Sequence, residues 1–227
     1  MKVVKRIFTV FLVMFVCKSF STLGIRINEA YINKLHNKIT SQKHILDRLE
    51  NKYQKVDDKN NYYNLLLSTY NILNITYSYS SDKLFLLELS NTIIEESEKN
   101  GFDPFLILAI INVESDFNNK ALSYKGAMGL MQVKPQTAYY ITSKDNNINL
   151  SNDGELFNPV TNIKIGINYL GYLNNKFNNN LKLALIAYNI GPGKLIKLIK
   201  SHKDLPKQYY RKVNNVYKRI SEYNNKI

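Results

Sequence analysis

Apolar residues recur at helical spacing along most of the chain, and the first regular run lies between residues 28 and 80. This stretch contains neither Gly nor Pro. Its apolar positions alternate at intervals of three and four residues in two successive seams, the pattern of amphipathic helices. The first seam comprises Ile32, Leu35, Ile39, the polar Gln42, Leu46, Leu49, Tyr53 and Val56, and the second comprises Tyr63, Leu66, Tyr70, Leu73 and Tyr77.

The polar stretch DDKNN at residues 57–61 separates the two seams and predicts a break between two helices. We favour a helical hairpin packed on itself or on the main domain, because the seams are short for a stable coiled coil. A coiled-coil spacer or oligomerisation arm is the alternative.

Capping residues mark further helices after residue 81. Asp82 predicts a helix over residues 83–99, which the NG pair at 100–101 ends. Asp103-Pro104 and Asn158-Pro159 each combine an N-cap with a first helical proline, and the second of these helices extends to about Phe177. The remaining predicted helices begin at Pro135, cover 181–188 before the stop signal NIGPG at 189–193, and fill 194–227.

No run alternates with a period of two, so the sequence predicts an all-α chain with at most a small β-hairpin around Gly126 and Gly129. A chain of 227 residues suffices for one good core and a smaller appendage. We expect a helical region at residues 22–81 and a main domain at residues 82–227, with the boundary in SSDK at 80–83.

The first 21 residues have the pattern of an export signal. Lys2, Lys5 and Arg6 precede ten apolar residues at 7–16, too few to span a bilayer, which takes about 20. Cleavage is expected after Ser21. Lipidation at Cys17 is less favoured, because the bulky Val16 precedes it. The expected location is the periplasm or cell envelope, either free or retained at the inner membrane by an uncleaved N-terminus.

The net charge of +13 favours partners that carry negative charge, such as nucleic acid, an anionic membrane or an anionic polymer. No nucleic-acid-binding motif accompanies it, so nucleic acid is not expected. The single Cys excludes an intramolecular disulfide framework, and His36, His44 and His202 are scattered. We therefore expect no metal site and no cofactor.

Glu114 stands at the end of the apolar run FDPFLILAII. On a helix it shares a face with Ile107, Ile110 and Ile111, which lie seven, four and three positions earlier. Burial against hydrocarbon raises the pKa of a carboxyl group, so that it can hold a proton near neutral pH and act as general acid on a glycosidic bond. The alternative is that the side chain reaches water at the helix end.

Three sequence blocks resemble the catalytic domain of the soluble lytic transglycosylases, goose-lysozyme-like enzymes that cut peptidoglycan. The first reads ES-x-F-x(3)-A-x-S-x(2)-GA-x-GLMQ-x(2)-P-x-TA and runs from Glu114 to Ala138. NPVTNIKIGINYLGYL and ALIAYNIGPG follow in the same order as in the family. The stretch LPKQYYRKV departs from the family pattern, because it lacks the usual Glu-Thr-Arg run. Residues 22–80 are not covered by the resemblance.

The resemblance implies a lysozyme-like helical domain in which Glu114 is the sole acid/base. It would protonate the oxygen between N-acetylmuramic acid and N-acetylglucosamine, and then take the proton of the muramoyl C6 hydroxyl as a 1,6-anhydro end forms. The implied substrate contacts are Ser123, Met131, Gln132, Tyr188 and Asn189. Structural alternatives stand beside them: a turn for Ser123, the core for Met131, a helix cap for Asn189, and a buried structural hydrogen bond for Tyr188. The family Tyr that Tyr188 matches approaches the catalytic Glu with its hydroxyl.

Two other functions remain open on the residues alone. A lysozyme-type hydrolase needs a second carboxylate, and Asp145, Asp153 or Glu155 could approach, whereas Asp116 points elsewhere on the helix. A non-catalytic glycan-binding or scaffold protein is the third reading. The partners implied are peptidoglycan glycan strands, with an anionic membrane surface and envelope secretion or division machinery as further candidates.

Overall fold

The structure is a computed structural model that describes residues 29–77, 82–145 and 147–224. The predicted export signal at residues 1–21, with Cys17, lies outside these ranges. The chain divides into two compact units, Met1–Asn60 and Asn61–Ile227. Within the described residues, no helix has both the length and the apolar character needed to cross a membrane.

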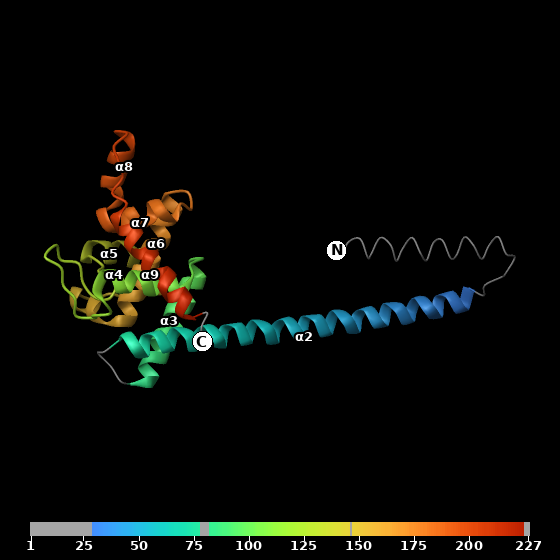
Figure 1. Cartoon of the computed structure of the whole chain (residues 1–227). Helices are drawn as coiled ribbons and strands as arrows, with labels where there is room; N and C mark the ends of the chain where they lie inside the picture. The colour runs from blue at the N-terminus through green and yellow to red at the C-terminus, as the bar shows by residue number, and fades with distance from the viewer. Residues whose placement is uncertain (1–28, 78–81, 146, 225–227) are drawn as a thin grey trace. The chain divides into compact units, whose positions relative to one another are not determined.

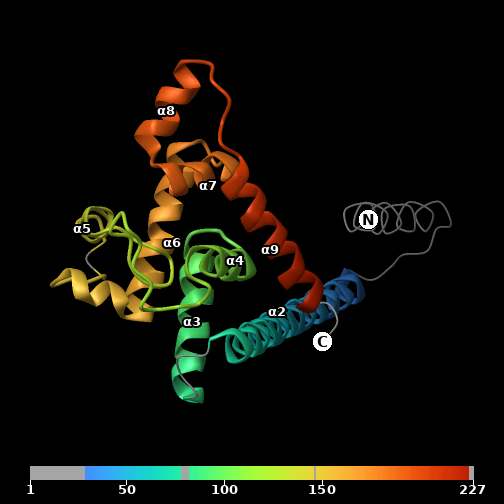
Figure 2. The ribbon, with the colours of Figure 1, turned by 60° about the vertical axis from the view of Figure 1, so that its left-hand side comes forward.

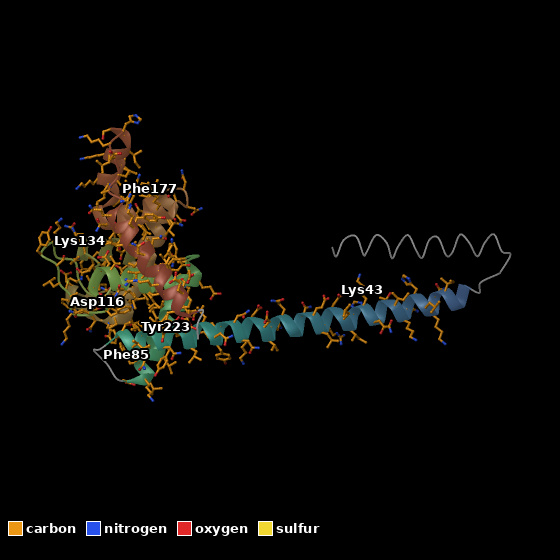
Figure 3. The ribbon with its side chains drawn as sticks, in the orientation of Figure 1. Lys43, Phe85, Asp116, Lys134, Phe177 and Tyr223 are labelled. Carbon is orange, nitrogen blue, oxygen red and sulfur yellow. The ribbon has the colours of Figure 1, made fainter. Side chains whose placement is uncertain are left out.

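The first helix of the described residues, α2, runs without interruption over Glu29–Thr76, through the residues where a break was predicted (Figure 1). The hairpin prediction is therefore wrong. Residues 57–61 are polar but include neither Gly nor Pro, so they leave the backbone hydrogen bonds of an exposed helix intact. The described side chains between 32 and 60 are exposed, such as Lys43, labelled in Figure 3. The coiled-coil alternative for this segment stays a prediction.

The helices predicted from caps after residue 81 are present. Asp82 accepts backbone hydrogen bonds at the start of α3, Asp103 does so for α4, and Asn158 for α6, where Pro104 and Pro159 follow the caps. The compact unit that begins at Asn61 contains the last part of α2 and α3 Lys83–Lys99, α4 Pro104–Ser115, α5 Pro135–Thr142, the 3₁₀ helix η1 Asp153–Phe157, α6 Pro159–Lys176, α7 Leu181–Ile190, α8 Pro192–Lys200 and α9 Gln208–Asn224.

The core of this unit surrounds α4 (Figure 2). Every residue of α4 from Pro104 to Ile111 is buried, and α9 packs along it, while α3 contacts both α4 and α6. A helix that is apolar on all sides gains about 1.5–3 kcal/mol for each large side chain it buries, so α4 is fixed by its neighbours over most of its length. Its C-terminal end, which carries Glu114, is consequently held in a defined position.

No sheet forms in the described residues. Around Gly126 and Gly129, where a small hairpin was allowed for, two isolated antiparallel bridges pair Met128 with Leu122 and with Val133. These bridges shape the loop between α4 and α5.

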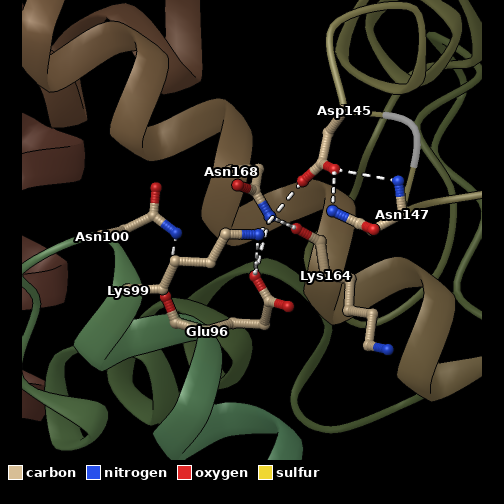
Figure 4. A network of polar contacts seen from close by, with 7 residues as sticks. All are labelled: Glu96, Lys99, Asn100, Asp145, Asn147, Lys164 and Asn168. Atoms are coloured by element: carbon tan, nitrogen blue, oxygen red, sulfur yellow. Dashed lines mark hydrogen bonds and ion pairs between the residues drawn. The ribbon is translucent and has the colours of Figure 1, made fainter.

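A polar network ties the loop after α5 to α3 and α6 (Figure 4). Lys99 Nζ lies 3.1 Å from Asp145 Oδ2 and 3.7 Å from Glu96 Oε2, and Asn168 Nδ2 donates to Glu96 Oε2 at 2.9 Å. The backbone N–H of Asn147 and the Lys99 ammonium both hold the pKa of Asp145 below its usual value. Asp145 is thus committed to this network.

Candidate active site

The carboxyl group of Glu114 lies where the apolar helix α4 meets a cleft. Ile107, Ile110 and Ile111 on the same helix are fully buried, as the spacing predicted. Burial raises the pKa of Glu114 from 4.5 to about 7, and a hydrogen bond from Tyr209 opposes part of this rise. At neutral pH this side chain is therefore protonated in a substantial fraction of the molecules.

Tyr209 is one of two residues of the candidate site that sequence reasoning missed. It is on α9, and its hydroxyl donates to Glu114 Oε1 at 2.6 Å. Burial and the charge of Glu114 both raise the pKa of Tyr209 well above its ordinary value, so the phenol keeps its proton and remains a donor. The signal available in the sequence was only an apolar pair, Tyr209 and Val213, spaced four apart within the stretch LPKQYYRKV, and both side chains are buried.

The cleft has a volume of about 540 Å³ and contains Glu114 as the only carboxylic acid among its described lining residues. Three lysines, Lys125, Lys134 and Lys194, also line it. Lys134 is labelled in Figure 3. The cleft thus combines one protonatable acid with a surplus of positive charge. The other lining residues are Ser123, Tyr124, Ala127, Gln132, Val133, Thr137, Tyr169, Tyr188, Asn189, Ile190, Gly191 and Pro192.

The loop between α4 and α5 brings Ser123 and Gln132 into the cleft. Ser123 Oγ accepts from the backbone N–H of Ala127 at 2.9 Å. Ser123 therefore also holds the turn before Gly126, which is the structural role considered for it from the sequence. Gln132 has a left-handed backbone (φ 49°), and its side-chain amide donates to the carbonyl groups of Ala121 and Gly129. Both side chains are held by their own loop, which fixes how they face the cleft.

Asn162 anchors that loop to α6 and was not identified as a site residue from the sequence. Its fully buried amide accepts from Met131 N at 2.7 Å and donates to the carbonyl oxygens of Met128 at 2.9 Å and Leu156 at 2.7 Å. Gly129 lies against the same side chain, and a Cβ there would come within 2.4 Å of Asn162 Nδ2. Gly129 is therefore required for packing on Asn162, whereas Gly126 (φ 73°) has open space beside it.

Met131 is a core residue, so the substrate contact predicted for it is not where its side chain lies. It is fully buried and packs on Gly166, where a Cβ would come within 2.5 Å of Met131 Sδ. Only its backbone belongs to the site: the Tyr188 hydroxyl donates to Met131 O at 2.8 Å. Tyr188 lines the cleft, and burial together with the charge of Glu114 raises its pKa well above the ordinary value. The hydroxyl bonded to Glu114 is that of Tyr209.

Asn189 lies in the last turn of α7 with its side chain exposed in the cleft, and Gly191 (φ 85°) is the residue that caps this helix.

The acids considered as second carboxylates have other partners. Asp153 accepts from the Tyr139 hydroxyl, and Glu155 accepts from the backbone N–H of Ser151. Among the residues that the structure describes, no three His, Cys, Asp or Glu side chains come together to hold a metal ion.

The model of the family described as Transglycosylase SLT domain matches residues 91–211. The chain is similar to the membrane-bound lytic murein transglycosylase C of Mannheimia succiniciproducens, at 34% identity over 140 residues that cover 54% of this chain and 39% of the relative. It is also 42% identical over 88 residues to the soluble lytic murein transglycosylase of Escherichia coli strain K12, which covers 39% of this chain and 14% of that protein. It thus spans well under half of either relative.

Among solved structures, the crystal structure of the 70-kDa soluble lytic transglycosylase of Escherichia coli aligns with a TM-score of 0.55 and 26% identity, over 70% of this chain and 29% of that one. The expected all-α, lysozyme-like helical architecture is confirmed. Since the family model covers more than half of its residues, the chain belongs to the transglycosylase SLT domain family.

Proposed function

We propose that the chain is a peptidoglycan lytic transglycosylase in which Glu114 is the single general acid/base. The observation that carries this proposal is the carboxyl group of Glu114, the one acid among the described residues that line the cleft, with a pKa raised to about 7 by burial. The names of the curated relatives, lytic murein transglycosylases, support the reaction class.

The reaction needs two proton transfers, and Glu114 takes part in both: it gives one proton to the leaving oxygen and takes another from the C6 hydroxyl. Protonated Glu114 donates to the oxygen of the β-1,4 bond between N-acetylmuramic acid and N-acetylglucosamine, and the bond from that oxygen to C1 breaks through an oxocarbenium-like state. The Glu114 carboxylate then removes the proton of the muramoyl C6 hydroxyl as O6 bonds to C1. A 1,6-anhydromuramoyl end results, no water is consumed, and Glu114 regains its proton.

A hydrolase of lysozyme type is the less favoured reading, because it would use a second carboxylate within about 5–9.5 Å of the first. Asp145, Asp153 and Glu155 all interact with partners outside the cleft lining.

In the favoured mechanism Tyr209 orients the Glu114 carboxyl group and stabilises its ionised form. Ser123, Gln132 and Asn189, which all line the cleft, offer polar groups to the sugars.

The cellular setting follows from the same substrate. We propose export to the cell envelope, directed by residues 1–21, where the +13 chain meets anionic peptidoglycan and an anionic membrane surface. We propose likewise that the enzyme acts together with envelope secretion or division machinery.

The decisive experiment is a digest of purified peptidoglycan sacculi with the full chain, followed by mass spectrometry of the released fragments. The proposal expects anhydro ends, which are one water lighter than hydrolysed reducing ends. Fragments that carry only hydrolysed ends would identify a hydrolase instead. No fragments, with retained binding to sacculi, would favour a glycan-binding or scaffold protein.

A further inference from the structure

Four tyrosines form a continuous row that begins in the cleft and leaves it. Tyr188 and Tyr169 line the cleft beside Glu114, with ring centroids 5.4 Å apart. The Tyr172 ring lies 6.3 Å from that of Tyr169 in a nearly parallel orientation (15°). Tyr140 meets Tyr172 edge-on at 5.3 Å. The outer pair, Tyr140 and Tyr172, has no part in the proposed chemistry.

Helical spacing makes the outer pair an extension of the cleft walls. Thr137 on α5 and Tyr169 on α6 line the cleft, and these two helices pack on each other. Tyr140 and Tyr172 follow them by three positions on the same helices, so they occupy the same faces one turn further on. Both walls therefore continue past the cleft as aromatic surface.

The outer pair is accessible and ends at a cation. Tyr140 is 42% exposed and Tyr172 is partly exposed. The exposed Lys176, one further turn along α6, places its Nζ 3.2 Å from the Tyr172 hydroxyl and 5.4 Å from the centre of that ring. Lys176 takes part in neither of the ion pairs found among the described residues, which both belong to Lys99.

This combination of groups matches a sugar polymer that bears carboxylates. A pyranose ring presents a face of C–H groups that can pack on an aromatic ring, and hydroxyls at its edge that can bond to a phenol. Muramoyl lactyl groups and stem peptides add carboxylates that suit the Lys176 ammonium group, which donates to the Tyr172 hydroxyl but belongs to neither ion pair of the described residues. An ordinary helix contact would need the aromatic packing but neither the exposed Tyr140 nor the cation.

We propose that Tyr140, Tyr172 and Lys176 form an outer subsite that binds the glycan strand beyond the sugars held next to Glu114. This inference rests on the proposed function, since it takes the polymer in the cleft to be peptidoglycan. Its consequence is a preference for long strands, because short fragments leave the outer subsite empty.

Binding can be measured separately from cleavage. In a Glu114→Gln background, purified glycan strands sorted by length are titrated calorimetrically against the otherwise unaltered chain and against Tyr140→Ala, Tyr140→Phe and Tyr139→Ala. Tyr139 is the matched control, since it neighbours Tyr140, is 43% exposed, and bonds to Asp153 instead. We expect Tyr140→Ala to weaken long-strand binding roughly threefold to tenfold more than short-fragment binding, as the loss of one aromatic contact implies. Tyr140→Phe keeps the ring and should retain most of the preference.

The outer subsite is rejected if Tyr140→Ala weakens binding of long and short strands equally, if Tyr139→Ala has the same length-dependent effect, or if affinity does not depend on length before Tyr140 is changed. A lower melting temperature for Tyr140→Ala with an unaltered length preference also rejects it and identifies a packing contact. The proposed function fails in a different way: the wild-type chain would release no fragments from sacculi, whatever the binding results.

Discussion

The Tyr209 hydroxyl and the Glu114 carboxyl group, 95 positions apart in sequence, are joined by a hydrogen bond of 2.6 Å. Two effects on the acid therefore compete. Burial favours its neutral form, and the donated hydrogen bond favours its charged form, with burial the larger of the two. The balance leaves a pKa of about 7, where the group can both give and accept a proton.

Tyr209→Phe should move the alkaline limb of the pH–rate profile to higher pH. The variant loses the hydrogen bond that lowers the pKa of Glu114, so the acid keeps its proton over a wider range. The maximal rate should fall, because the carboxyl group loses its orienting partner. The measurement is kcat/KM on sacculi across the neutral range. Tyr210→Phe is the control, as its ring faces Lys182 instead, and a limb displaced equally in both variants would contradict the assignment.

Glu114→Gln should lower the rate of fragment release by at least about 10²-fold while the fold is retained, since the amide preserves the shape but cannot transfer a proton. Asp116→Asn is the matched control. Asp116 lies two residues away, is exposed, and accepts from Asn112 outside the cleft lining. A Glu114→Gln rate within about tenfold of wild type would exclude Glu114 as the acid.

The same substitution should change how stability depends on pH. The pKa of Glu114 is 4.5 for an unperturbed group and about 7 in the fold, so the folded state binds this proton more tightly. The wild type therefore loses stability as the pH rises from about 4.5 to about 7, and the full cost applies above that window. Glu114→Gln removes the cost. Its melting temperature relative to wild type should rise from about pH 4 to about pH 8, and a constant difference would contradict the raised pKa.

Helix boundaries were predictable because their causes are local. Asp103 and Asn158 bond to backbone N–H groups within three residues, so each cap can be read from a few letters. The break predicted at residues 57–61 failed because polarity alone does not stop a helix when neither Gly nor Pro is present. The burial of Glu114 was predictable because its apolar neighbours precede it on its own helix.

The parts of the site that were missed depend on contacts between distant segments. Tyr209 reaches Glu114 only because α9 packs along α4. Asn162 reads as an ordinary residue near the start of a helix, and its role arises where the α4–α5 loop and η1 meet α6. No spacing within one element carries this information. Met131 shows the converse, since the motif placed it among the substrate contacts whereas its side chain is buried in the core.

Asn162→Ala should be among the more destabilising single substitutions. It would leave Met131 N and the carbonyl oxygens of Met128 and Leu156 buried without their partner, and each such group costs about 1–3 kcal/mol. We expect a loss of roughly 2–5 kcal/mol in the free energy of unfolding, measured by denaturant titration. Asn175→Ala, at an exposed position of the same helix, should change it by no more than about 0.5 kcal/mol. Similar losses in both would remove Asn162 from this role.

The C-terminal part of the chain supplies most of the excess positive charge. Residues 181–227 contain eleven Lys or Arg and two acidic residues, a net charge of +9. Helix α8 begins at the cleft, which Pro192 and Lys194 line, and continues to the exposed Lys197 and Lys200, with Lys203 exposed just beyond. A cationic surface that leads away from the cleft would raise the local concentration of an anionic polymer and speed its encounter with the site.

Sacculus binding should therefore weaken between low and moderate salt, because exposed charges are screened over about 10 Å at 0.1 M salt. Replacing Lys197, Lys200 and Lys203 with Gln should flatten this dependence and slow association while dissociation changes little. The matched control replaces three exposed lysines of α2, Lys34, Lys38 and Lys43, and so removes the same net charge elsewhere. If the α8 variant kept the wild-type salt slope, these lysines would only maintain solubility. Equal flattening in both variants would attribute the effect to total charge instead of its position beside the cleft.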